Sequence, residues 1–86
     1  VDSWVEINGN DYLITDNTGT SSPQDGFQVM VGLQGWGNGN VFERNAATVA
    51  AGGFGFHIGP GASGNVVACN NLVESAGAGF ANIPCQ

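Results

Sequence analysis

An asparagine that returns at a nearly constant interval is the feature that most restricts the fold of this chain. Asn17, Asn45 and Asn70 each follow a short run with apolar residues. The interval between them is about 25 residues or slightly more, and self-similarity at such a period is typical of repeat architectures, in which each repeat is one supersecondary unit. The whole chain has 86 residues and therefore holds between three and four such units.

A second marker repeats in phase with the asparagines. The segment that ends at Ile7 aligns with segments that end at Val31, Ile58 and Ile83, and the interval is nearly the same each time. Extra residues of the second repeat, 33–38, lie between its two markers, as expected where insertions are confined to one corner. Because the intervals of the two markers vary together along the chain, they indicate a true repeat.

The period predicts an all-β fold, a right-handed parallel β-helix of about three and a half coils of roughly 25 residues. Side chains alternate at Phe27, Val29 and Val31, which we expect to fill the interior. The 15 glycines suit tight corners and weaken helices, and three leucines are too few for leucine-rich repeats. We expect residues 1–86 to form a single solenoid segment, either the C-terminal part of a longer solenoid or a stacking subunit.

These markers resemble the right-handed β-helix repeats of the pectate-lyase-like superfamily of carbohydrate-active and solenoid proteins. The resemblance covers most of the chain and implies a coiled sheet with a glycan-facing side. It implies no catalytic residue, because no motif of the lyases surrounds Arg44, the one residue of the chain that could serve as their basic group.

The outward positions of the first strand in each repeat are the candidate glycan contacts. We expect Glu6, Met30, His57 and Asn82 to form one column, and Trp4, Gln28, Gly55 and Phe80 to form another. Aromatic rings stack on sugars, and acids and amides bond to hydroxyl groups. Trp36, in the glycine-rich insertion, either stacks on a sugar or folds back as a lid. The candidate contacts are therefore Trp4, Glu6, Gln28, His57 and Trp36.

Three further groups of residues have structural interpretations. Asn17, Asn45 and Asn70 are predicted to form a ladder of side-chain amides between coils. Cys69 and Cys85 are predicted to form a disulfide, which indicates an oxidising compartment. Arg44 aligns with Asp16 one repeat earlier, which favours an ion pair of at most about 1 kcal/mol.

Charge excludes several classes of partner. The formal net charge is −6, with one Lys or Arg in the chain, so nothing would neutralise nucleic-acid phosphates. No apolar run approaches the roughly 18 residues of a membrane span. We expect no metal, no cofactor, and a secreted or cell-surface location. The leading hypothesis is a noncatalytic extracellular segment with a structural or glycan-facing role, whose partners are a polysaccharide, further coils or copies of itself. The alternative is part of a polysaccharide lyase or glycoside hydrolase, so enzymatic activity stays open.

Overall fold

The computed structural model describes residues 3–22, 24–49 and 52–86, and within these ranges it holds strands and no helix. The all-β expectation is therefore confirmed. The strands are β1 (Ser3–Ile7), β2 (Leu13–Thr15), β3 (Thr18–Ser22), β4 (Asp25–Val29), β5 (Val41–Glu43), β6 (Ala46–Val49), β7 (Phe54–Ile58), β8 (Val66–Val67), β9 (Leu72–Glu74) and β10 (Gly79–Ala81).

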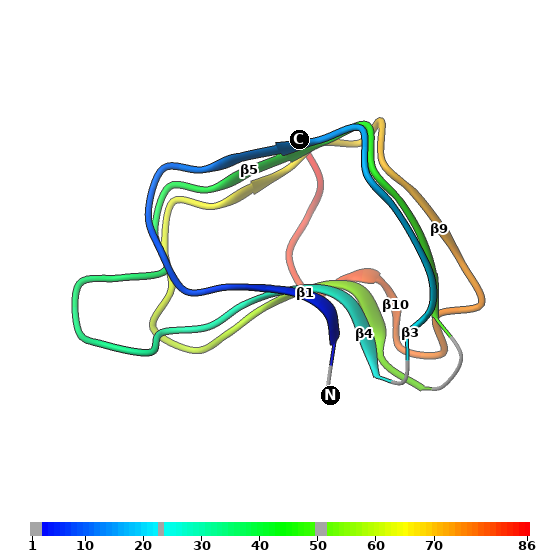
Figure 1. Cartoon of the computed structure of the whole chain (residues 1–86), viewed down its shortest axis with the longest axis horizontal. Helices are drawn as coiled ribbons and strands as arrows, with labels where there is room; N and C mark the ends of the chain where they lie inside the picture. Colours follow the sequence, from blue (N-terminus) through cyan, green and yellow to red (C-terminus); the bar gives the residue numbers. More distant parts are fainter. Residues whose placement is uncertain (1–2, 23, 50–51) are drawn as a thin grey trace.

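The strands form three small parallel sheets. Sheet A has the order β1-β4-β7-β10, sheet B the order β2-β5-β8, and sheet C the order β3-β6-β9. The chain runs through sheets A, B and C in turn, and we call each such circuit a pass: β1 to β3 form the first, β4 to β6 the second and β7 to β9 the third. Successive passes overlie one another in the view of Figure 1. Corresponding segments of successive repeats are thus hydrogen-bonded neighbours in the same sheet.

The register in sheet A differs by two residues from the alignment made on the sequence. Val5, Glu6 and Ile7 lie beside residues 27–29 and not beside residues 29–31. The next pair follows the same pattern, because Gln28 lies beside His57. The outward column is therefore Glu6, Gln28 and His57, and Met30 lies after the end of β4.

Aromatic rings fill the space between the sheets. Phe27, Phe42 and Phe56 are fully buried, and the rings of Phe27 and Phe56 are stacked with centroids 5.0 Å apart. Phe42 meets both rings edge-on from sheet B. Burying each ring contributes roughly 1.5–3 kcal/mol, so this cluster is the main apolar contribution to stability. Val31, which we expected in the interior, is only partly buried.

A corner with positive φ recurs before sheet B in every pass. Asp11, Gly39 and Gly64 have φ values of 59°, 72° and 68°. The left-handed region suits glycine and, among other residues, chiefly Asp and Asn. The corner therefore explains why Gly-Asn precedes sheet B in the second and third passes.

The expected right-handed β-helix of about three and a half coils is corrected to a coarser description. Each sheet has three or four strands, so its strands stack over only about 15 Å at the usual strand spacing. The extents of the molecule are 32 × 24 × 19 Å, and the radius of gyration is 11.4 Å. The structure is a compact globule of small parallel sheets, and the assignment to pectate-lyase-like β-helix repeats is wrong.

The C-terminal segment returns across the molecule and is held by the predicted disulfide, which is confirmed. Cys69 and Cys85 are bonded, with their Cα atoms 5.0 Å apart. The bond places Gln86 beside β8, where its N–H donates to the oxygen of Val67 and its own oxygen accepts from Cys69 N–H, both at 3.0 Å. The last residue of the chain thus covers the end of the last strand of sheet B.

Candidate functional site

A column of polar residues lies on the outer side of sheet A, and it follows from the pairing of β1, β4 and β7. Glu6, Gln28 and His57 occupy matching positions on β1, β4 and β7. Glu6 is exposed, and its carboxylate accepts a hydrogen bond of 3.1 Å from the amide of Asn8. Glu6 and His57 stand two strands apart, about 9–10 Å, so they cannot form a hydrogen-bonded pair.

Gln28 connects the column and is not itself open to solvent. It is only 6% exposed, because its side chain lies between Ser3 and His57. The hydroxyl of Ser3 lies 2.9 Å from Oε1, and Nε2 lies 3.5 Å from Nδ1 of His57. A buried amide of this kind supports neighbouring side chains and is not itself accessible to a ligand.

Asp25 is the residue of this face that the sequence did not indicate. Its Oδ2 lies 3.3 Å from Nδ1 of His57, and its side chain is 3% exposed. The two atoms are within ion-pair distance but outside hydrogen-bond geometry, so Oδ2 has no hydrogen-bond partner among the described residues. Oδ1 accepts a hydrogen bond of 2.7 Å from the N–H of Phe54. The contact is an ion pair only while the imidazole is protonated.

The imidazole of His57 is held on a second side by an aromatic ring. Phe54 and His57 lie near one another on β7, three positions apart along the strand. Their ring centroids are 5.8 Å apart at an interplanar angle of 19°, so the two rings lie nearly parallel. Both residues are only partly buried, and they lie on the side of sheet A that also carries Glu6, two strands away.

Trp4 does not belong to this face. Ser3 and Val5 lie beside Asp25 and Phe27, so Trp4 stands opposite Gly26. Its ring lies directly on Gly19 of sheet C and meets Phe27 edge-on at 5.4 Å. Trp4 remains 42% exposed. Its ring therefore covers the apolar interior at the end of the molecule where β1 lies and leaves part of its surface in solvent. Its assignment to an outward column with Gln28 is corrected.

Trp36 lies in the loop that projects from the corner between sheets A and B (Figure 1). The loop is tied to the first pass, because Gly37 N–H donates to the oxygen of Gly9 and Asn10 donates to the oxygen of Gly35. Trp36 is 48% exposed. No described contact joins it to Glu6 or His57, so the structure separates it from the polar column.

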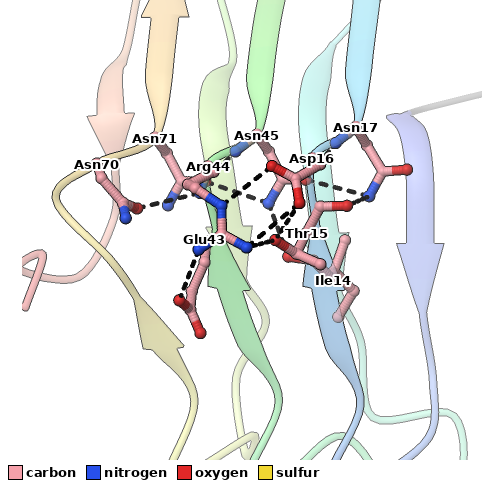
Figure 2. Close-up of polar contacts among 9 residues, drawn as sticks. All are labelled: Ile14, Thr15, Asp16, Asn17, Glu43, Arg44, Asn45, Asn70 and Asn71. Atoms are coloured by element: carbon pink, nitrogen blue, oxygen red, sulfur yellow. Dashed lines mark hydrogen bonds and ion pairs between the residues drawn. The ribbon is translucent and has the colours of Figure 1, made fainter.

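The asparagine ladder uses a different third member from the one predicted. The side chains link Asn17 to Asn45 and Asn45 to Asn71, at 3.1 Å in each case (Figure 2). Asn70 instead accepts a hydrogen bond of 3.0 Å from the backbone N–H of Arg44. The third pass has one more residue between sheets B and C than the second, so Asn71 reaches the position that Asn45 occupies.

Sequence reasoning also missed a second ladder at the corner before sheet B. The N–H and Nδ2 of Asn40 both donate to Oδ1 of Asn65, at 2.9 and 3.0 Å. The recurring Gly-Asn pair in the sequence is the signal that could have indicated this second ladder. Both residues are buried, so these asparagines build the corner and are unavailable to a ligand.

Arg44 pairs with Asp16 as predicted from their alignment. Its Nε and Nη2 donate to the two carboxylate oxygens of Asp16 at 3.0 and 3.2 Å, and Nη2 also reaches Thr15 (Figure 2). These hydrogen bonds lower the pKa of Asp16 from its ordinary value and raise the pKa of Arg44. Both side chains are exposed, so the pair is a surface feature of small energetic weight.

The described residues offer no arrangement typical of a cofactor site. They contain no group of three or more His, Cys, Asp or Glu side chains placed to hold a metal ion, and no enclosed pocket. In the same ranges there is no helix of the length and apolarity that crossing a bilayer requires. The chemistry that remains is that of a partly exposed imidazole, a carboxylate and an aromatic ring on one sheet face.

Comparison with known proteins returned no relative: no family model, no curated protein and no solved structure matches this chain. The pectate-lyase-like superfamily named from the repeat therefore finds no support there either. The period of the repeat reflects the length of chain needed to pass through three short strands, and unrelated chains can meet that requirement. Any function must therefore be argued from the face of sheet A itself.

Proposed function

We propose that this chain is a noncatalytic extracellular module whose sheet A face contacts a polysaccharide. The observation that carries the proposal is that the partly exposed stack of Phe54 and His57 shares one face of sheet A with the exposed carboxylate of Glu6, two strands away. An aromatic surface supplies stacking for a sugar ring, while carboxylate and imidazole groups bond to hydroxyls. Gln28 and Asp25 support the imidazole from beneath, which lowers the entropic cost of ordering it on binding.

Charge narrows the class of glycan. The chain carries a net charge of −6, and Glu6 adds a carboxylate to the proposed face. A polymer of uronic acids would meet like charge there, which opposes binding. We therefore propose a neutral polysaccharide as the ligand, and we place the protein outside the cell, which agrees with the disulfide between Cys69 and Cys85.

The test is a glycan array followed by titration of ¹⁵N-labelled protein with the neutral oligosaccharide that binds best. We expect shift changes at the amides of Glu6, Gln28 and His57, and weaker binding by His57→Ala. Gln28→Ala should weaken binding by releasing the imidazole, whereas Gln34→Ala, at an exposed glutamine in the projecting loop, should leave affinity unchanged. Shift changes confined to another face, or no binding on the array, would remove the proposal.

A second candidate is a polysaccharide-cleaving enzyme, lyase or hydrolase, and the pairing of Asp25 with His57 is the observation that favours it. In the tautomer that carries its proton on Nδ1, 3.3 Å from the buried carboxylate of Asp25, Nε2 is free to act as a base, and Gln28 then makes no hydrogen bond to Nδ1. A lyase would show rising absorbance from its unsaturated product, and a hydrolase would release reducing sugar. Turnover lost in both His57→Ala and Asp25→Asn would establish this alternative over the noncatalytic role.

A further inference from the structure

The asparagine ladder follows one rule from pass to pass. Each Oδ1 accepts two hydrogen bonds, from the backbone N–H and from the Nδ2 of the asparagine one pass earlier. Oδ1 of Asn45 accepts both from Asn17 at 3.0 and 3.1 Å, and Oδ1 of Asn71 accepts both from Asn45 at 2.8 and 3.1 Å. The second ladder, from Asn40 to Asn65, repeats the arrangement.

Asn17 stands at the end of this ladder with its acceptor unused. No described residue donates to its Oδ1, which Figure 2 shows on the side away from Asn45. Asn17 lies between β2 and β3, which are the outermost strands of sheets B and C. Outermost strands present unpaired backbone groups along their free edge. Tyr12 and Leu13, at the start of β2, are more than half exposed at the same end.

The opposite end of sheet B shows what covers such an edge in this protein. There the C-terminal segment crosses the molecule and ends beside β8, where Gln86 exchanges two backbone hydrogen bonds with Val67 and Cys69 (Figure 1). The disulfide of Cys85 holds the segment in place. The β8 edge of the sheet is therefore covered in part by Gln86, while the edge at β2 is left open among the described residues.

A second copy of the chain does not supply the missing donors. In a twofold arrangement Asn17 would face Asn17, whose N–H and Nδ2 are already committed to Asn45 and Thr15. In a head-to-tail arrangement the partner would present Asn71, whose N–H donates to Ala68 and whose Nδ2 donates to Phe42 and Ala68. An occupant that continued the ladder would bring an asparagine whose donors are free.

We propose that the edge formed by β2, Asn17 and β3 binds an extended polypeptide segment with the pattern strand–asparagine–strand, running parallel to this edge. The segment adds one strand to sheet B and one to sheet C, and its asparagine donates two hydrogen bonds to Oδ1 of Asn17. Main-chain bonds supply affinity, and the asparagine sets the register. This site lies apart from the sheet A face and does not depend on the proposed glycan contact.

The probe is a synthetic peptide with the sequence of residues 41–49, since in the structure this segment docks on Asn71 in the required manner. Titrated into ¹⁵N-labelled protein, it should shift the amides of residues 13–19. The same peptide with its asparagine replaced by alanine should bind about fivefold more weakly, because the hydrogen bond from Nδ2 to Oδ1 is lost while the backbone N–H can still donate. That variant leaves the folded protein untouched, so its result cannot reflect misfolding.

Two variants of the protein complete the test. Asn17→Ala removes the acceptor of both hydrogen bonds and should weaken peptide binding by more than this factor, while Asn70→Ala, in an exposed asparagine of the third pass, should not change it. Equal affinity for both peptides would overturn the proposal, as would shifts confined to sheet A or to the β8 end. Concentration-dependent dimers that shift residues 13–19 without peptide would overturn the assignment of the occupant. Loss of glycan binding with peptide binding retained would affect only the proposed function.

Discussion

The backbone N–H and the Nδ2 of Asn45 both donate to a single oxygen, Oδ1 of Asn71, at 2.8 and 3.1 Å. Both residues are buried, and Nδ2 of Asn71 in turn donates to the backbone oxygen of Phe42 at 2.9 Å. The two asparagines thus satisfy backbone groups at a corner where the chain leaves one sheet for the next.

Replacing Asn71 should therefore cost far more than replacing its neighbour. Asn71→Ala leaves the buried N–H of Asn45 without an acceptor and leaves Nδ2 of Asn45 with only its bond to Ile14, which we expect to lower the free energy of unfolding by about 2–4 kcal/mol. Asn70→Ala removes one exposed acceptor and should cost less than about 1 kcal/mol. Urea denaturation followed by tryptophan fluorescence measures both. Equal losses would contradict the assignment of Asn71 to the ladder.

Gly55 should not tolerate a side chain. A Cβ there would lie 2.7 Å from the oxygen of Phe80 and closer still to the side chain of Val73. We expect Gly55→Ala to lower the free energy of unfolding by about 1–3 kcal/mol through overpacking. Gly52 is the matched control, because no described atom lies within 4 Å of a Cβ built there. Thermal unfolding by circular dichroism compares the two, and an unchanged midpoint for Gly55→Ala would contradict the packing.

Breaking the disulfide should uncover the β8 edge. Cys69 and Cys85 are 16 residues apart, and closing a loop of that size contributes about 3 kcal/mol in the chain-entropy model. We expect Cys85→Ser to lose about that amount and to increase hydrogen exchange at the amides of Cys69 and Gln86, which donate to the oxygens of Gln86 and Val67. Hydrogen exchange measured with and without reductant tests this. Unchanged protection in the reduced protein would show that the segment is held without the bond.

The pKa of Asp16 should depend on Arg44. Hydrogen bonds from Arg44 and Thr15 hold this pKa below its ordinary value of 3.8. Stabilisation by the pair is therefore fully present above the ordinary value and is lost as pH falls through the lowered one. Arg44→Gln should raise the pKa of Asp16 toward 3.8, and Arg44→Lys, which keeps charge without the bidentate contact, should raise it less. A carboxyl NMR titration measures all three proteins, and identical curves would exclude the pair in solution.

Register is the part of the fold that the repeat could not decide. Phe27, Val29 and Val31 alternate with other residues, so a shift of two residues keeps every apolar side chain on the same face. The hydrophobic pattern is therefore equally consistent with both alignments, and only packing of Phe27 against Phe56 separates them. Because the two-residue error carried into the expected columns, it placed Met30 where Gln28 lies.

The candidate site was accessible from sequence only in part. Glu6 and His57 were identified because their neighbours alternate as in a half-buried strand. Asp25 could not be found in this way, since its position beside His57 depends on the pairing of β4 with β7. Trp4 was misplaced for a related reason: its ring covers Gly19, a contact between sheets A and C that no local pattern contains.

By itself the sequence determined that the chain is all-β, that its strands are short and parallel, and that Cys69 and Cys85 are bonded. These properties follow from local causes: many glycines, period-two alternation, a regular repeat and two cysteines. Only the tertiary structure decided the register, the ladder from Asn45 to Asn71, and the pairing of Asp25 with His57. Each depends on which residues of different passes meet across a sheet, where one inserted residue or a two-residue shift changes the contact and leaves the local pattern intact.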